Sequence, residues 1–176
     1  MFEEIKKKIS HFILRQRYVK KNSNPLPYTN VISNAHSFFI VMPKQDDDFS
    51  CSLEILKYLS AKKKSITLFL PNNKLSLIPQ KEKFRFISFN PEQVTKFNLP
   101  GKKIIEYLDG MEFDIAIDLN RREDVLFSAV TNIAKSKLKV SFAKEFSESY
   151  YNLQITDKQA SSEASYRSFL NYLQMF

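Results

Sequence analysis

Glycine is scarce in this chain, which has only Gly101 and Gly110 among its 176 residues. Loops that wrap closely around a nucleotide phosphate use several glycines, because a residue without a side chain lets the backbone approach the ligand. The scarcity of glycine therefore excludes a glycine-rich nucleotide-binding loop.

Cysteine and histidine are also rare, with one cysteine, Cys51, and two histidines, His11 and His36. A single cysteine cannot form an intramolecular disulfide, and the three residues do not have the spacing of a zinc site. We expect Cys51 to be a reduced residue of the core or of a helix, and we expect no metal ion and no bound cofactor. A chain of this kind fits the cytoplasm.

Long hydrophobic runs are missing as well, because charged residues interrupt every apolar stretch. The N-terminal segment is therefore expected to be neither a signal peptide nor a membrane span. The chain does contain apolar material for a core, with 43% hydrophobic and 14% aromatic residues. At this length, that content is enough for one domain and not for two.

Positive charge is concentrated in residues 1–21, where seven Lys and Arg side chains face two Glu, in a chain of net charge +8. Apolar residues recur there at spacings of three and four, which predicts an amphipathic helix. Its basic surface consists of Lys6, Lys7, Lys8, Arg15, Arg17, Lys20 and Lys21. Three interpretations are open: the helix packs on the domain with its basic face in solvent, it associates with an anionic lipid surface, or it binds RNA or an acidic protein.

Residues 22–36 are rich in turn-forming residues and lack periodicity, so we interpret them as a tether. Residues 37–176 then alternate between strand and helix patterns. The expected strands are 37–42, 65–70, 83–89, 113–119 and 138–142, and the expected helices are 49–61 and 125–134, with one or two short helices in 91–108. After a short apolar piece at 151–155, a last helix is expected to open at Thr156, because Gln159 gives the spacing of a capping box.

This alternation predicts an α/β fold with a single doubly wound, mainly parallel, Rossmann-like sheet and an N-terminal amphipathic helix. In the usual strand order three-two-one-four-five, the strands that begin at Ser37 and Phe113 are neighbours at the switch point, where ligands of such sheets bind. The loops that leave these two strands, 43–48 and 118–122, should then face each other across a crevice.

The side chains of this crevice suit two kinds of chemistry. The candidate catalytic carboxylates, for a general base or for Mg²⁺, are Asp46, Asp47 and Asp48. The candidate ligand-binding residues are Lys44, Asp118, Asn120, Arg121 and Arg122, of which the two arginines are suited to grip a phosphate. The alternative is structural: the three aspartates precede the helix at Phe49, favour its N-terminus and pair with the arginines. Asp118 is expected at the end of its strand, because an unpaired acid is costly to bury.

The stretch from Ser37 to Phe142 resembles the N-terminal, acceptor-side half of the heptosyltransferases, which are family 9 glycosyltransferases. The resemblance is carried by a first hydrophobic strand, an acidic turn, a helix, a second strand ending in Leu-Phe-Leu-Pro, and the segments Phe-Asp-Ile-Ala-Ile-Asp-Leu and Lys-Val-Ser-Phe. It implies a Rossmann-like fold. The chain is also similar to short uncharacterised proteins of Bacteroidetes-type bacteria, which implies a standalone domain.

The chain departs from the glycosyltransferase pattern at the positions that carry chemistry. The Gly-Asp pair typical after the first strand is replaced by Met42-Pro43-Lys44-Gln45-Asp46, and Ser141 stands where a glycine is typical. No residues remain for the second domain with which those enzymes bind a nucleotide-sugar donor, and one half cannot orient both substrates.

We therefore predict a non-catalytic binding or protein-interaction module, with a protein partner or a small phosphorylated ligand. One alternative is a small Mg²⁺- or phosphate-dependent, sugar-nucleotide-related enzyme that uses the crevice. The other is a membrane-surface or RNA-associated factor that acts through residues 1–21. The expected location is the cytoplasm, or the periphery of the inner membrane if the basic helix binds lipid.

Overall fold

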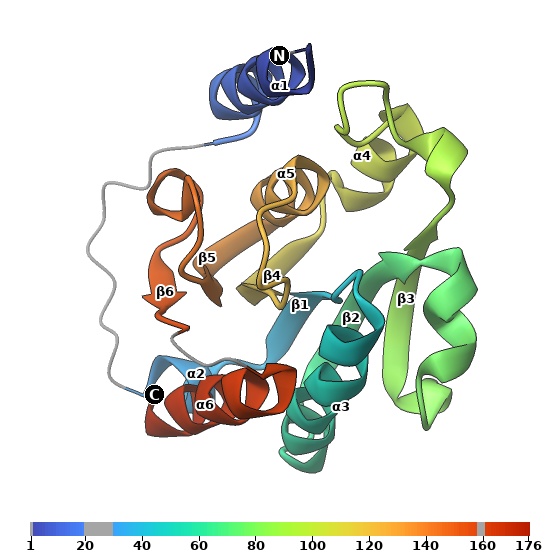
Figure 1. The fold of residues 1–176 in the computed structure, drawn as a ribbon. Helices are drawn as coiled ribbons and strands as arrows, with labels where there is room; N and C mark the ends of the chain where they lie inside the picture. Colours follow the sequence, from blue (N-terminus) through green and yellow to red (C-terminus); the bar gives the residue numbers. More distant parts are fainter. Residues whose placement is uncertain (1, 20–29, 158–160) are drawn as a thin grey trace.

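The computed structural model describes residues 2–19, 30–157 and 161–176. One six-stranded sheet lies between two groups of helices (Figure 1). Its strand order is β3-β2-β1-β4-β5-β6, and every neighbouring pair is parallel. The predicted fold class and the predicted order of the first five strands are confirmed.

The centre of the sheet is formed by β1 (Ser37–Val41), β2 (Ser65–Pro71) and β4 (Glu112–Asp118). These segments are continuous apolar runs rich in aromatic and β-branched residues, which suits strands that are buried on both faces. Successive side chains of a strand point to opposite faces. Phe38 of β1 accordingly joins the core on one face of the sheet, and Phe39 joins the core on the other.

The outer strands are β3 (Phe84–Phe89), β5 (Lys135–Phe142) and β6 (Leu153–Ile155). β5 begins earlier than the sequence indicated, because Lys135 already pairs with Glu112 of β4. The short apolar piece expected at 151–155 contains the edge strand β6, which extends the sheet beyond β5.

One face of the sheet is covered by α3 (Asp46–Ala61), α6 (Ser162–Met175) and the helical turn α2 (Val31–Asn34) (Figure 1). Ile32 of α2 is buried in the same core as α6, and its N–H donates to the carbonyl of Phe176 at 3.1 Å. The predicted tether over 22–36 is therefore too long at its C-terminal end, because this contact with α6 folds residues 31–34. Residues 22–29 lie outside the described part of the chain.

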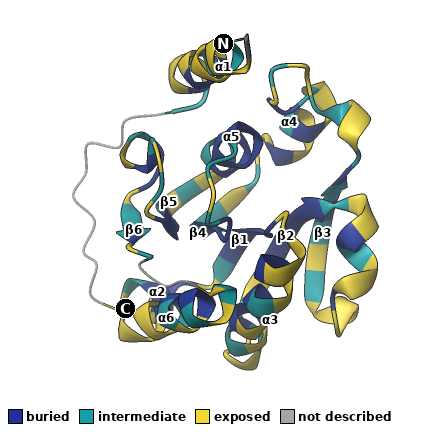
Figure 2. Cartoon of the chain, in the orientation of Figure 1, coloured by how far each residue is buried: buried dark blue, intermediate teal, exposed yellow. Residues whose placement is uncertain are grey.

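The other face is covered by α4 (Lys102–Leu108) and α5 (Val125–Ile133), and α1 (Phe2–Arg17) packs over α5 (Figures 1 and 2). α5 is buried on almost all sides because it lies between the sheet and α1. Four short 3-10 turns complete the described structure: η1 (Asn72–Leu77), η2 (Lys81–Lys83), η3 (Pro91–Gln93) and η4 (Ser147–Ser149).

Two helix starts differ from the prediction. α3 begins at Asp46 and not at Phe49, so the three aspartates form its first turn, where the helix dipole favours acids. α6 begins at Ser162, capped by the Ser161 hydroxyl, which accepts from the N–H of Ala164 at 3.2 Å. The predicted capping box at Thr156 is therefore wrong, and Gln159 lies outside the described residues. The physical reason is that Asp157 is held by Arg121 and Ser165, which keeps this segment out of the helix.

None of the helices in residues 2–19, 30–157 and 161–176 has the length and apolarity required to span a lipid bilayer.

Candidate functional site

The loops that follow β1 and β4 meet at the carboxyl edge of the sheet. The side-chain oxygen of Asn120 accepts from the backbone N–H of Lys44 at 3.0 Å, and its amide nitrogen donates to the carbonyl of Met42 at 3.3 Å. Asn120 thus fixes the loop after β1 to the loop after β4, and the structure brings together Lys44, Asn120 and Asp118 from the predicted crevice.

Asp118 closes β4 and is completely buried. Its Oδ2 accepts from the ammonium of Lys144 and from the hydroxyl of Tyr151, both at 2.6 Å, and its Oδ1 accepts from the N–H of Asn120. Burial of Tyr151, followed by the nearby Asp118 charge, raises the pKa of its phenol well above its usual value. The predicted position of Asp118 at the strand end is correct, but its partners Lys144 and Tyr151, which compensate for the burial of its charge, were not predicted.

Arg121 links three segments instead of facing solvent. Its Nε donates to Asp157 at 2.7 Å, and its Nη1 lies 3.4 Å from Asp48 and 3.2 Å from the hydroxyl of Ser162. Burial lowers the pKa of this guanidinium, but the hydrogen bonds and charges of Asp157 and Asp48 together outweigh burial, so the pKa is raised overall. Asp48 therefore pairs with an arginine, as the structural alternative expects.

The remaining residues of the predicted crevice are dispersed. Arg122 and Asp47 are exposed. Asp46 pairs with Lys74 at 2.5 Å. Within the described ranges, no group of three or more His, Cys, Asp or Glu side chains is arranged to hold a metal ion.

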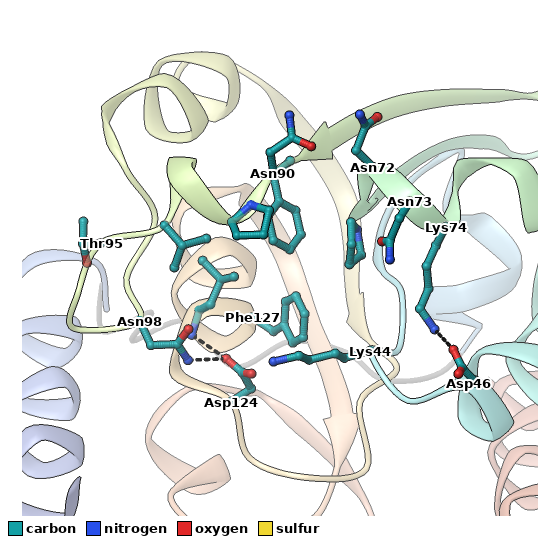
Figure 3. A pocket seen from close by; sticks show the side chains of 15 residues that line it. Lys44, Asp46, Asn72, Asn73, Lys74, Asn90, Thr95, Asn98, Asp124 and Phe127 are labelled. Carbon is teal, nitrogen blue, oxygen red and sulfur yellow. Dashed lines mark hydrogen bonds and ion pairs between the residues drawn. The ribbon is translucent and has the colours of Figure 1, made fainter.

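The open space lies beside this paired cluster, in a cleft of about 720 Å³ at the carboxyl ends of β1, β2 and β3 (Figure 3). We call it the edge cleft. Its rim is polar and is formed by the segments that follow the three strands and by the loop that precedes α5. The polar residues of the rim are Lys44, Asp46, Asn72, Asn73, Lys74, Asn90, Thr95, Asn98 and Asp124.

The floor of the edge cleft is apolar. Phe89 stacks on Phe69 with their centroids 4.8 Å apart and meets Phe127 edge to face at 6.3 Å. Phe89 and Phe127 both line the cleft, together with Pro71, Pro91, Val94 and Leu126. An apolar floor under a polar rim is typical of a site for a small ligand.

The charges of the edge cleft are few and largely fixed. Asp124 caps α5 by accepting from the N–H of Leu126 at 2.9 Å, and it also accepts from the amide of Asn98 at 2.8 Å. Lys74 is held over the ring of Phe49 and pairs with Asp46. Lys44 is exposed and extends towards Asp124 across the cleft, at a place that a ligand can reach (Figure 3).

Four asparagines of this cleft, Asn72, Asn73, Asn90 and Asn98, were not predicted as site residues. Asn72 and Asn73 directly follow β2, and Asn90 directly follows β3. Polar side chains at the carboxyl ends of parallel strands away from the switch point are therefore a signal that points to this cleft.

A second hollow of about 660 Å³ adjoins the edge cleft, and both are bordered by Lys44, Thr95, Asn98 and Asp124. Its other wall is α1, and Glu123 lies on its border. Glu123 accepts from the hydroxyl of Ser128 at 2.9 Å, whereas its second oxygen is buried without a partner among the described residues. Burial, opposed by the charge of Lys144, raises the pKa of Glu123 to about 7.

The basic side chains of α1 divide into two groups. Lys7 pairs with Glu145 at 2.5 Å, Arg15 donates to Ser149 at 3.0 Å, and Lys6 lies 3.8 Å from Glu3. Lys8 and Arg17 are exposed. Lys20 and Lys21 lie outside the described residues.

Comparison with protein families gives one match. A family described as a family of unknown function (DUF6913) matches residues 6–176, which is nearly the whole chain. No curated protein matches the chain. The resemblance to glycosyltransferases therefore stays a prediction.

Proposed function

We propose a function for this chain, which belongs to the family of unknown function DUF6913. It is a binding module, and its edge cleft holds a small ligand that is rich in hydroxyl groups and carries one anionic group. The observation that carries the proposal is the edge cleft itself, about 720 Å³ in volume, with an asparagine-rich rim over a phenylalanine floor. In this proposal the protein is a glycosyltransferase-like module, as predicted from the sequence, that binds its ligand but does not transfer a sugar.

The size and position of the edge cleft support a small ligand. Ligand clefts in proteins measure about 300–1,000 Å³. In open parallel sheets, ligands bind outside the carboxyl ends of the strands, and the edge cleft lies at the carboxyl ends of β1, β2 and β3.

The chemistry of the rim supports hydroxyl groups on that ligand. Each asparagine side chain has a carbonyl acceptor and two N–H donors, so it matches a hydroxyl group, which both donates and accepts. Asn72 and Asn73 are exposed at the rim and are free of side-chain hydrogen bonds among the described residues. Pro71, Pro91 and Val94 offer an apolar surface for the carbon skeleton of a sugar-like ligand, and Phe89 and Phe127 lie almost fully buried beneath it.

Lys44 supports the anionic group. Its side chain is exposed and has no ion pair within the described residues, whereas Lys74 is neutralised by Asp46. A lysine binds phosphate as a compact point charge. A phosphorylated sugar therefore matches both the asparagines and this lysine.

The engagement of the carboxylates supports binding without group transfer. The two acids that line the edge cleft are both occupied: Asp46 pairs with Lys74, and Asp124 caps α5 and holds Asn98. The alternative enzyme in the predicted crevice has less support, because Asp48 and Asp118 are paired with Arg121 and Lys144.

The test is a titration of the ¹⁵N-labelled full chain with sugar phosphates, free sugars and inorganic phosphate, followed by amide chemical shifts. We expect sugar phosphates to shift the amides of residues 72–74, 90–98 and 124–127. Lys44→Met should weaken binding by about tenfold or more, because a hydrogen bond to a charged group is lost. The matched control is Lys57→Met, since Lys57 is 78% exposed on α3 and remote from the edge cleft.

Activity is tested separately by incubating the protein with ADP- and UDP-sugars and each bound sugar. We expect no consumption of the donor. Transfer to the bound sugar would contradict the non-catalytic part of the proposal. The absence of any shift at the edge cleft with every compound would contradict the binding part.

A further inference from the structure

We propose that the outward face of α1 docks the protein on an anionic lipid surface. Three of the seven large hydrophobic side chains that are exposed in the described structure lie on this helix: Ile5, Ile9 and Phe12, with 51%, 42% and 66% exposure. Their spacing of four and three residues places them in one row on the helix surface. We call this row the outer stripe.

The outer stripe is not needed to hold α1 on the domain, because the opposite side of the helix does that. Leu14 is completely buried among Val125 and Ala129 of α5. Beside it, the hydroxyl of Ser10 donates to the carbonyl of Phe97 at 2.7 Å, and His11 bonds the hydroxyl of Tyr150 at 2.6 Å. The helix is thus fixed in an orientation that leaves the outer stripe in solvent.

Positive charge borders the outer stripe mainly on one side. With 3.6 residues per turn, Lys8 and Arg15 lie along that side, whereas Arg17 lies further round the helix, well past the other side of the stripe. Lys8 and Arg17 are exposed and make no ion pair in the described part of the chain. The two acids of the helix, Glu3 and Glu4, line the hollow between α1 and the domain together with Lys6 and Lys7.

This arrangement selects an anionic bilayer as the partner. A helix that lies in a membrane interface presents an apolar row to the acyl chains and Lys or Arg to the lipid phosphates. RNA would pair with the lysines and arginines but would gain nothing from two isoleucines held in solvent. Lys20 and Lys21 follow in the sequence and add further basic charge after the helix.

The test is flotation of the full chain with phosphatidylcholine vesicles, with and without phosphatidylglycerol. We expect the protein to float with the anionic vesicles only. The variant Ile5→Ser/Ile9→Ser/Phe12→Ser should partition at least about tenfold less, because it loses the apolar contact with the acyl chains. A matched control is Leu77→Ser/Tyr107→Ser/Met175→Ser, which replaces three large hydrophobic side chains elsewhere that are exposed to a similar or greater degree and should float like the unmodified chain.

Charge is tested by Lys8→Glu/Arg17→Glu against Lys57→Glu/Lys102→Glu, which makes the same change in net charge on α3 and α4. Each basic residue near an anionic surface contributes roughly fivefold in binding, so the first variant should bind at least about tenfold more weakly, and the second should not. The difference should shrink at high salt.

Four results would overturn the proposal. The first is that the unmodified chain does not float with anionic vesicles, and the second is that the control variants lose as much vesicle binding as the test variants. The third is a dimer in solution that the stripe variant converts to a monomer. The fourth is RNA binding in the absence of vesicles that the charge variant removes. The third would make the outer stripe an interface between two copies, and the fourth would make α1 an RNA-binding element. Circular dichroism melts of each variant establish that its fold is intact.

Discussion

At the scale of single residues, two Lys–Asp pairs of similar geometry differ in burial. Lys144 lies 2.6 Å from Asp118, with 3% and 0% of their side chains exposed, whereas Lys137 lies 2.8 Å from Asp114, with 74% and 25% exposed. A hydrogen bond from Lys137, together with backbone N–H groups of His36 and Ser37, lowers the pKa of Asp114. Both pairs have the short distance of a strong ion pair, but we expect the buried pair to contribute more to the stability of the protein than the exposed pair.

We predict that Lys144→Met destabilises the protein by about 3 kcal/mol, because it leaves the buried Asp118 carboxylate without its counter-charge. Lys137→Met should change the unfolding midpoint little, since the exposed partner is replaced by water. Urea denaturation of the two variants measures this contrast. Equal losses of stability would show that the Lys144 pair is not special, and that the surrounding hydrogen bonds of Asp118 hold it instead.

Glu123 should make stability fall as the pH rises. Its pKa is raised by burial from 4.5 to about 7 in the folded protein. Between these values the folded chain keeps a proton that the unfolded chain has released, so stability decreases with rising pH in this window, by an amount on the order of 2 kcal/mol. We expect Glu123→Gln, which cannot ionise, to be more stable than the unmodified chain at pH 8 and equal to it at pH 4.

The titration of His11 changes stability with pH in the opposite direction and therefore partly cancels the effect of Glu123. Burial, together with the charges of Lys7 and Arg15, lowers the pKa of His11 from 6.5 to about 4. Between these values the unfolded chain binds the extra proton, so stability increases with rising pH. The difference between Glu123→Gln and the unmodified chain isolates the Glu123 contribution. A difference in urea midpoint that stays constant from pH 4 to pH 8 would contradict the raised pKa.

At the scale of elements, α1 depends on a neutral His11. The imidazole packs at 4.3 Å on Phe146 and hydrogen-bonds Tyr150, while its Nε2 is buried without a partner in the described structure. Protonation there places a charge against Lys7 and Arg15. We predict that α1 leaves the domain as the pH falls towards 4 while the sheet stays folded.

Limited proteolysis with an acid-active protease, which cuts beside apolar residues, detects this release as cleavage next to the buried Leu14. His11→Gln keeps a hydrogen-bonding side chain but does not titrate in this range, so its α1 should remain protected in acid. Leu14→Ala should expose the same segment at every pH, because it removes the buried anchor of the helix. Acid-induced cleavage that is unchanged in His11→Gln would assign the switch to another group.

Most elements were predictable from the sequence because their signals are local. β1, β2 and β4 are continuous apolar runs, and each ends at a residue that the pattern marks, such as Pro71. The start of α6 was not predictable, because the competing contact between Asp157 and Arg121 joins residues far apart in the chain. α2 was missed for the same reason, since Ile32 folds against the far C-terminus.

The predicted site was incomplete for a related reason. The pattern brought Lys44, Asn120 and Asp118 together correctly, because strand order fixes which loops are neighbours. It did not reveal that Lys144 and Tyr151 would fill the space around Asp118, nor that the open cleft would lie at the carboxyl ends of β1, β2 and β3. Which side chains pair at the edge of the sheet depends on the directions in which they point, and the periodicity of the sequence does not determine these directions.

At the scale of the whole molecule, α1 carries the lipid surface that we propose and lies near the proposed ligand site, although it does not line the edge cleft itself. This helix forms a wall of the second hollow, which adjoins the edge cleft, and it carries the outer stripe on its other side. A bilayer bound to the outer stripe would therefore lie on the other side of α1 from the second hollow and the edge cleft. An effect of lipid binding on the edge cleft would require that α1 moves without unfolding the sheet.

The packing of the helices supports that independence. α1 contributes one completely buried side chain, Leu14, to a small cluster, whereas α6 contributes Tyr166, Phe169 and Leu173 to the main core. Local opening of an element requires less free energy when few apolar contacts are broken. We predict that amides of α1 exchange with deuterium at least about a hundredfold faster, after correction for intrinsic rates, than those of β1 and β4.

Native-state hydrogen exchange of the full chain in increasing urea distinguishes local opening of α1 from global unfolding of the protein. Exchange of the central α1 amides should depend weakly on urea, as for a local opening, and exchange of the α6 amides should merge with that of the sheet, as for global unfolding. If the α1 and β4 amides report the same free energy of opening, the helix is an integral part of the folding unit. Lipid binding through α1 would then have to act on the folded protein as one rigid body, with no separate movement of the helix.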